Sequence, residues 1–305
     1  MRSIAVAGGT GPVGKTIVDG LVAYGKHKIF VLSRNDRPSD EGVEYLTVDY
    51  TDVKGLSQVF SQAGVDTVVC AIGVATPETN QAQLNLIRAA DQSEPTRRFV
   101  ISGYDMQHLE ETIEINPLSR YTFEAIESLE KTDLEYTRVV NGWFLDYYGM
   151  PYWKTHLHPW INVINMEKKW AAVPGDGSAR ATFTTTQDMS KFVARLMDVE
   201  KWDKITTISN ETLTFNQVVA LAEKTRGCKF QVAYDSLEKL RLGKISFFNE
   251  FPPIEFENAE AFFAMIHLQA GLERLLVAEE HSLTHEFPEI RLTKMAEVMQ
   301  AWEGK

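Results

Sequence analysis

The chain has 305 residues, 44% of them hydrophobic and 24% charged, with a formal net charge of −11. This acidic balance argues against a nucleic-acid binder or a protein of anionic membranes, because both need basic surface. With no apolar run of about 18 residues, no signal peptide and only two cysteines, we expect a cytoplasmic protein without disulfides or a membrane span.

Short apolar runs and amphipathic segments alternate as far as Val140. Strands are predicted at residues 4–7, 29–32, 43–48, 65–72, 99–101 and 136–140. Helices are predicted after Pro12, after an Asp52 N-cap, around Leu84, and over 120–129. This alternation predicts an α/β fold, a Rossmann-type doubly wound parallel sheet, over residues 1–142.

Residues 143–305 show a looser pattern that predicts a smaller, partly helical substrate lobe, from which the chain returns to the sheet. Helices are expected over 187–199 with a Thr186 cap, over 215–226 with a Thr214 cap, and over 258–280. A strand is expected over 230–234. Aromatic residues between Trp143 and Trp160 are interpreted as core or as the wall of a substrate pocket, which Phe247 and Phe248 would close.

A glycine-rich loop follows the first predicted strand and opens the first helix, with glycines at positions 8, 11 and 14. This spacing gives a tight turn, a close approach of phosphate to the backbone, and close packing of helix on sheet. The N–H groups at the helix start then face the phosphates. The residues of this loop that we expect to bind the cofactor are Gly8, Thr10, Gly11, Pro12, Val13 and Gly14.

The end of the second predicted strand indicates which dinucleotide binds. Ser33 and Arg34 stand where an acidic residue would select NAD, and a guanidinium suits a 2′-phosphate. Such a contact predicts a preference of about ten- to a hundredfold for NADP(H). The alternative is that Arg34 is solvated and Asp36 turns inward for NAD. Asp49, after the third strand, is a candidate for reading the adenine amino group or is merely a loop aspartate.

These residues together resemble the NmrA-like and isoflavone-reductase-like branch of the atypical short-chain dehydrogenases, and specifically fungal NmrA-like proteins. The resemblance covers nearly the whole chain and implies a Rossmann fold, NADP(H), and a cleft between the sheet edge and the smaller lobe. It also implies cofactor contacts from Ala71, Ile72 and Asn141. Besides the glycine loop and Ser33-Arg34, the matching segments are 71–73, 134–137, 141–147, 172–177, 184–188 and 287–290.

The catalytic pattern departs from that family. The Tyr-x-x-x-Lys spacing occurs at residues 24/28 and 50/54, which we interpret as chance because both lie near the adenine half. By the resemblance a lysine would fall near Thr122, yet the next lysine is Lys131. The candidates for a substitute acid are Tyr104, which follows the fifth strand and is preferred, Tyr121, Thr122, His108, Tyr147, Lys154 and His156.

Three functions remain open at this point. The favoured one is an NADPH-dependent reductase of a hydrophobic small molecule. The others are an NADP(H)-sensing regulator that binds a protein partner without turnover, and a non-redox isomerase or dehydratase that reuses the cleft. No metal is expected, because His156 and His158 lack a third ligand in the sequence pattern.

Overall fold

The computed structural model describes residues 1–40, 42–253 and 258–305. Within them, seven strands form one sheet in which all neighbours are parallel. Their spatial order is β11 (Ile205–Thr207), β6 (Glu135–Val140), β5 (Arg98–Asp105), β4 (Thr67–Cys70), β1 (Ser3–Ala7), β2 (Lys28–Ser33) and β3 (Val43–Thr47). The direction of winding reverses between β1 and β4, which opens a crevice at the carboxyl ends of these strands.

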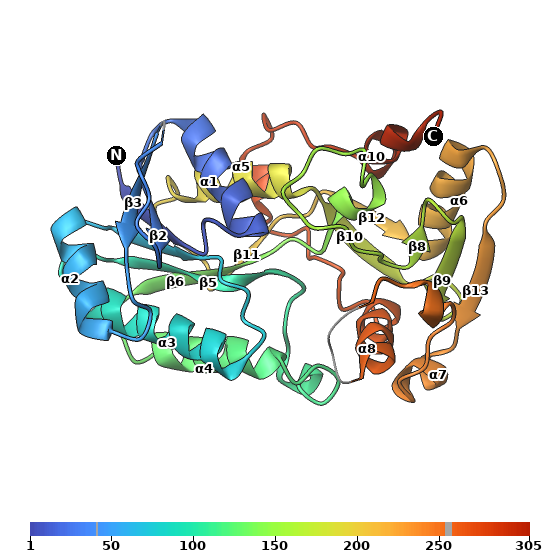
Figure 1. Ribbon diagram of the computed structural model, residues 1–305, viewed down its shortest axis with the longest axis horizontal. Helices are drawn as coiled ribbons and strands as arrows, with labels where there is room; N and C mark the ends of the chain where they lie inside the picture. The colour runs from blue at the N-terminus through green and yellow to red at the C-terminus, as the bar shows by residue number, and fades with distance from the viewer. Residues whose placement is uncertain (41, 254–257) are drawn as a thin grey trace.

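Helices cover both faces of the sheet, which confirms the predicted doubly wound α/β architecture (Figure 1). Apolar side chains of alternate positions in β1 and β2 pack under the two helix layers, and these form separate cores on the two faces. One layer is α1 (Pro12–Tyr24) and α5 (Thr186–Leu196); the other is α2 (Val53–Ala63), α3 (Pro77–Asp91) and α4 (Ser119–Leu129). The side chain of Asp52 caps α2 by accepting from the Gly55 N–H, as predicted.

The second lobe lies beyond the carboxyl edge of the main sheet and contains two small sheets (Figure 1). Their strands are β12 (Glu211–Thr214), β10 (Arg180–Thr184) and β7 (Trp143–Phe144) in one, and β13 (Gln231–Asp235), β9 (Trp170–Pro174) and β8 (Ile164–Asn165) in the other. The later helices are α6 (Phe215–Arg226), α7 (Leu237–Arg241), α8 (Ala259–Gly271), α9 (Leu283–Glu286) and α10 (Met295–Met299). Short 3₁₀ turns occupy Glu110–Thr112, Leu145–Tyr148, Phe248–Glu250 and Gln300–Trp302.

The chain passes between the two parts more than once. After β10 it returns to the main sheet, where α5 packs on α1 and β11 pairs with β6. It then enters the second lobe again through β12, whose following helix α6 has the predicted Thr214 cap. The lobe is therefore built from segments on both sides of α5 and β11.

Two helix predictions in this region are wrong. Helix α5 is capped by Thr185, whose side chain accepts from the Asp188 N–H at 3.0 Å, and not by Thr186. The helix expected over 258–280 ends at Gly271. After Gly271 the chain turns, with Glu273 at a φ of +57°, and the Thr182 N–H of β10 donates to the carbonyl of Leu275 at 3.0 Å. The apolar periodicity of residues 272–276 therefore does not continue the helix.

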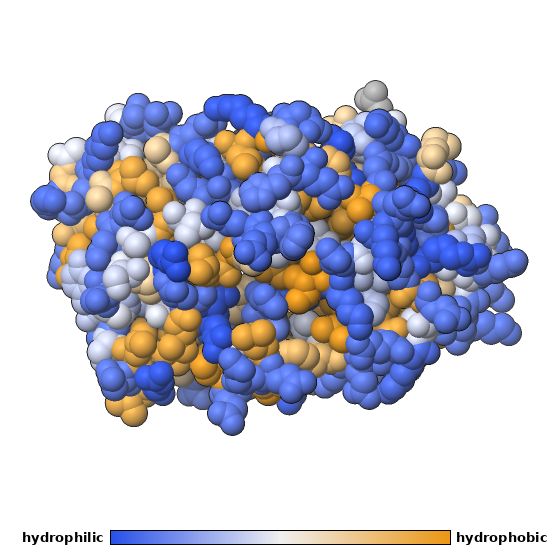
Figure 2. Space-filling model, turned by 180° about the vertical axis from the view of Figure 1, so that it is seen from behind, coloured by the Kyte–Doolittle hydropathy of each residue, from blue (hydrophilic) through white to orange (hydrophobic). Residues whose placement is uncertain are grey.

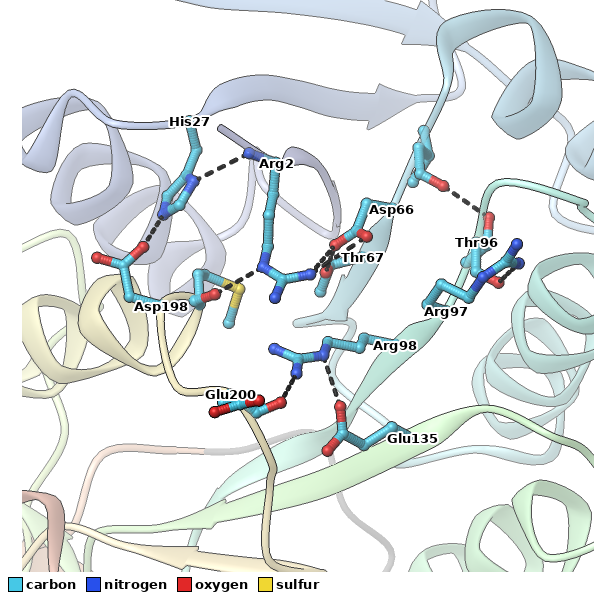
Figure 3. Close-up of polar contacts among 12 residues, drawn as sticks. Arg2, His27, Asp66, Thr67, Thr96, Arg97, Arg98, Glu135, Asp198 and Glu200 are labelled. Atoms are coloured by element: carbon cyan, nitrogen blue, oxygen red, sulfur yellow. Dashed lines mark hydrogen bonds and ion pairs between the residues drawn. The ribbon is translucent and has the colours of Figure 1, made fainter.

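A network of charged side chains ties the amino ends of the main-sheet strands (Figure 3). Arg2 contacts Asp66 at 3.0 Å before β1 and β4, and Arg98 contacts Glu135 at 2.6 Å at the start of β5 and β6. The Arg98 guanidinium also donates to the carbonyl of Val199 at 2.8 Å, and its side chain is only 6% exposed. This network joins four strands to the segment after α5 at the edge opposite the crevice.

The described surface does not identify a class of binding partner. On the face seen in Figure 2, apolar side chains form several separate patches bordered by polar ones. Within the described ranges, every helix is too short or too polar to cross a lipid bilayer.

Candidate functional site

The glycine loop joins β1 to α1 in a conformation that excludes side chains at two positions. Gly8 has a φ of +77°, and a Cβ there would lie 2.5 Å from the carbonyl oxygen of Ala71. A Cβ on Gly14 would lie 2.1 Å from the carbonyl oxygen of Gly8. Helix α1 begins at Pro12 and its amino end borders a cleft, so its free N–H groups form a site suited to phosphate.

The cleft runs over the carboxyl ends of β1, β2 and β4 and has a volume of about 1120 Å³. Its lining joins the Rossmann domain to the second lobe. From the Rossmann domain it takes Gly8, Thr10, Gly11, Pro12, Val13, Ser33, Arg34, Asp49, Ala71 and Ile72, which were all predicted, and Tyr50, Gly73 and residues of α3, which were not. The second lobe contributes Tyr147 and the segment Leu157, His158, Pro159 and Trp160.

Three polar residues that line the cleft near the ends of β2 and β3 differ in their exposure and hydrogen bonding. Arg34 is exposed, and the described part of the chain supplies no carboxylate partner for it. The hydroxyl of Ser33 is buried and donates to the Asn35 carbonyl at 2.7 Å, so it orders the turn around Arg34. Asp49 is exposed and accepts from the backbone N–H and the hydroxyl of Thr51, which lower its pKa. Asp36 does not line the cleft.

A second, smaller cavity of about 280 Å³ continues from the cleft. Val13, Ala71, Ile72 and Gly73 line both, so the two form one site across the β1–β4 crevice. The smaller cavity brings together the predicted catalytic candidates Tyr104, Tyr121 and Thr122, and also His108 and Asp105.

Tyr104 lies inside β5 and not after it, so the prediction of its place is wrong. The strand runs on through a register shift after Ile101, with Gly103 at a φ of +117°. The Tyr104 hydroxyl donates to the Cys70 carbonyl at 3.1 Å. Burial, followed by the nearby Cys70, raises the pKa of Tyr104 well above its ordinary value. The hydroxyl proton of Tyr104 therefore lies in a hydrogen bond to the backbone of β4.

The other candidates lie on α4 and on the loop after β5. The Tyr121 hydroxyl accepts from the Arg120 guanidinium at 3.2 Å. Thr122 Oγ1 lies 3.0 Å from His108 Nδ1, and His108 Nε2 lies 3.5 Å from Asp105 Oδ2.

Asp105 is in turn held by Arg138. The Arg138 guanidinium contacts the Asp105 carboxylate and donates to the Met106 carbonyl at 2.6 Å. Burial alone would raise the pKa of Asp105, but the charge of Arg138 and the contact with His108 outweigh it and lower this pKa to about 2. The carboxylate is thus ionised at neutral pH. Asp105 and Arg138 were missed in the sequence, although an acidic residue at a strand end is a recognisable signal.

Several other predicted site residues lie elsewhere. Asn141 is fully buried, its amide donates to the Gly142 carbonyl at 3.3 Å, and it lines neither cavity. The ring of Phe247 stacks on Trp170 at 5.0 Å, so the expectation that it closes the pocket is wrong. Phe248 packs in the same core of the second lobe.

Of the aromatic stretch, Tyr147 and Trp160 line the cleft, whereas Trp143 and Tyr148 belong to the core of the second lobe. Burial raises the pKa of Tyr147 to about 12. His156 Nε2 lies 2.7 Å from Asp19 Oδ2 of α1, and His156 lines neither cavity. This contact connects α1 to the segment next to Leu157 that lines the cleft.

Comparison with known proteins agrees with this architecture. A model of the NmrA-like family matches residues 1–290. Oxidoreductase BOA1 of Botryotinia fuckeliana is 34% identical over 75% of this chain and 78% of its own length. Oxidoreductase swnN of Metarhizium robertsii is 28% identical over 99% of this chain and 97% of its own length. The structure of AtPrR2 with NADP+ and (+)pinoresinol has a TM-score of 0.77 at 20% identity, with 99% of this chain and 98% of that chain covered.

Proposed function

Because the chain belongs to the NmrA-like family, we propose that it is an NADPH-dependent reductase of a hydrophobic small molecule. The observation that carries the proposal is Arg34, which borders the cleft without a carboxylate partner among the described residues. The name of the relative BOA1 and the NADP+ held by AtPrR2 support it.

The residues present fit this cofactor. Backbone lies where a Cβ on Gly8 or Gly14 would clash, so this conformation of the loop, with the start of α1 beside the cleft, requires glycine at both positions. Arg34 offers two parallel N–H donors to a 2′-phosphate. The volume of about 1120 Å³ exceeds that of most single small-molecule pockets, as a dinucleotide and part of a substrate require.

When bound, NADPH would supply a hydride. The start of α1 would hold its pyrophosphate and Arg34 its 2′-phosphate. Tyr147 and the segment 157–160 would cover the cleft and exclude water from it. Since these covering residues are mostly aromatic or apolar, we infer a substrate with a flat, apolar body.

Calorimetric titration with NADPH, NADP+, NADH and NAD+ tests the first part of this proposal. We expect the phosphorylated pair to bind at least tenfold more tightly than the other pair. Failure of all four to bind would overturn it. Turnover is then tested by NADPH oxidation with chalcone, dihydroisoquinoline and nitrobenzaldehyde, which represent enones, imines and carbonyls.

A second candidate, a dinucleotide sensor without turnover, is favoured by one observation. The preferred proton donor Tyr104 has its hydroxyl bonded to backbone, and the described lining of the smaller cavity holds no lysine. Under this alternative, NADPH and NADP+ would bind with very different affinities and no probe would be reduced.

A further inference from the structure

In the smaller cavity a hydroxyl, an imidazole and a carboxylate lie next to one another in that order. Thr122 Oγ1 lies 3.0 Å from one ring nitrogen of His108, and the other ring nitrogen lies 3.5 Å from Asp105. Within the ranges that the structure describes, His108 is the side chain or backbone group that hydrogen-bonds to the Thr122 hydroxyl. This is the arrangement of a nucleophile or acid, a base and an orienting carboxylate.

The contacts of His108 decide which group passes a proton on. Thr122, His108 and Asp105 all line the cavity; Thr122 is 8% exposed, and the side chains of His108 and Asp105 are 9% and 44% exposed. Within the described residues, Nδ1 of His108 contacts Thr122 Oγ1, whereas Nε2 is buried without a hydrogen bond, 3.5 Å from Asp105. A proton that leaves His108 from Nδ1 therefore passes through Thr122.

We propose that Thr122 is the proton donor to the substrate and that His108 supplies it, with Asp105 holding the imidazolium. The proposal rests on the reductase function above. In this scheme Thr122 takes the role of the lysine that the family resemblance predicts near this position. His108 and Asp105 act through Thr122 and are positioning residues in this scheme.

The proton transfer balances as follows. The Thr122 O–H bond breaks as its proton bonds to the substrate atom that has gained electron density from the hydride. Thr122 Oγ1 takes the Nδ1 proton of His108, which passes from imidazolium to neutral imidazole. Once product has left, solvent in the cavity returns a proton through Thr122 to His108 Nδ1, and Thr122 ends each cycle unchanged.

The charges around His108 suit this role. The ionised Asp105 carboxylate stabilises the imidazolium, and Arg138 keeps that carboxylate ionised and in place. The other titratable groups lining the cavity are Tyr104, which is bonded to backbone, and Tyr121, which accepts from an arginine. The Tyr104 proton is thus bonded to backbone, and Tyr121 makes no hydrogen bond to Thr122 or His108 among the described residues.

Kinetics of NADPH oxidation with the panel named above tests the proton path. Thr122→Val and His108→Gln should each lower kcat by about a hundredfold or more, with KM and NADPH binding unchanged. Thr122→Ser should retain most of the activity, because it keeps the hydroxyl. The double variant should lose no more than either single one, because the two act as a unit. His285→Gln, which removes an exposed imidazole on α9, is the matched control. Full activity of Thr122→Val would overturn the proposal.

A second measurement needs neither substrate nor cofactor. The ring nitrogen resonances of His108, assigned with His108→Gln, report its hydrogen bonds directly. Thr122→Val should alter the Nδ1 resonance, and Thr122→Ser should restore it. An Nδ1 resonance that Thr122→Val leaves unchanged would overturn the relay even if NADPH binds. A resonance that depends on Thr122 in a protein that binds no dinucleotide would instead support the relay and overturn the reductase function.

Discussion

Replacement of Arg34 by alanine isolates the contact that would separate the phosphorylated dinucleotides from the others. A hydrogen bond to a charged group contributes about 1.5–3 kcal/mol. Because Arg34 is exposed, solvent screening favours the lower half of that range. At about 1.4 kcal/mol per factor of ten, NADPH binding should weaken by about ten- to fortyfold, whereas NADH binding should change little. Calorimetric titration of both variants with both cofactors measures this difference directly.

Arg37 supplies the matched control for this experiment. It lies three residues further on, is exposed, sits 6.0 Å over the ring of Tyr45, and does not line the cleft. Arg37→Ala should leave both affinities unchanged. An equal loss of NADPH and NADH binding in Arg34→Ala would refute the 2′-phosphate assignment, because it would locate the effect in the shape of the cleft.

Three further outcomes are expected. Gly14→Ala should abolish dinucleotide binding in titrations and lower the melting temperature, because its Cβ would lie 2.1 Å from the Gly8 carbonyl. Burial lowers the pKa of His267 from 6.5 to about 4, so the folded state binds fewer protons than the unfolded state between these values. Stability should therefore fall as pH drops from 6.5 toward 4, and less steeply in His267→Gln; identical melting profiles would contradict this. Arg98→Ala should cost about 1.5–3 kcal/mol in urea unfolding, because it removes charge-assisted hydrogen bonds to Glu135 and to the Val199 carbonyl, whereas a similar loss in exposed Arg97→Ala would speak against that reasoning.

Local patterns were enough to predict the parallel sheet and most of the Rossmann-domain residues that line the larger cleft. Buried parallel strands are continuous apolar runs, and the glycine loop has steric requirements that only one residue type meets. Because the carboxyl ends of the strands meet at one edge, Arg34 and Ala71 could be placed together without knowledge of the fold.

The errors occur where distant segments decide the local structure. Residues after Gly271 follow a helical pattern, yet the chain turns at Glu273 and the Leu275 carbonyl accepts a hydrogen bond from Thr182 of β10. Tyr104 points back to β4 because the register of β5 shifts, which no spacing in the sequence reveals. The pairing of Thr122 with His108 depends on how the loop after β5 folds over the start of α4. The arrangement inside the smaller cavity was thus harder to predict than the lining of the larger cleft.

The charged network at the amino edge of the sheet, centred on Arg2 and Arg98, has a consequence for how the protein can change. The network stabilises the sheet at the strand ends far from the cleft. Loops at the opposite edge can therefore change in sequence without destabilising the sheet. Substitutions around the larger cleft should then alter selectivity while expression and folding stay intact. A library aimed at new substrates would vary residues such as Leu157 and Trp160 and leave the amino edge untouched.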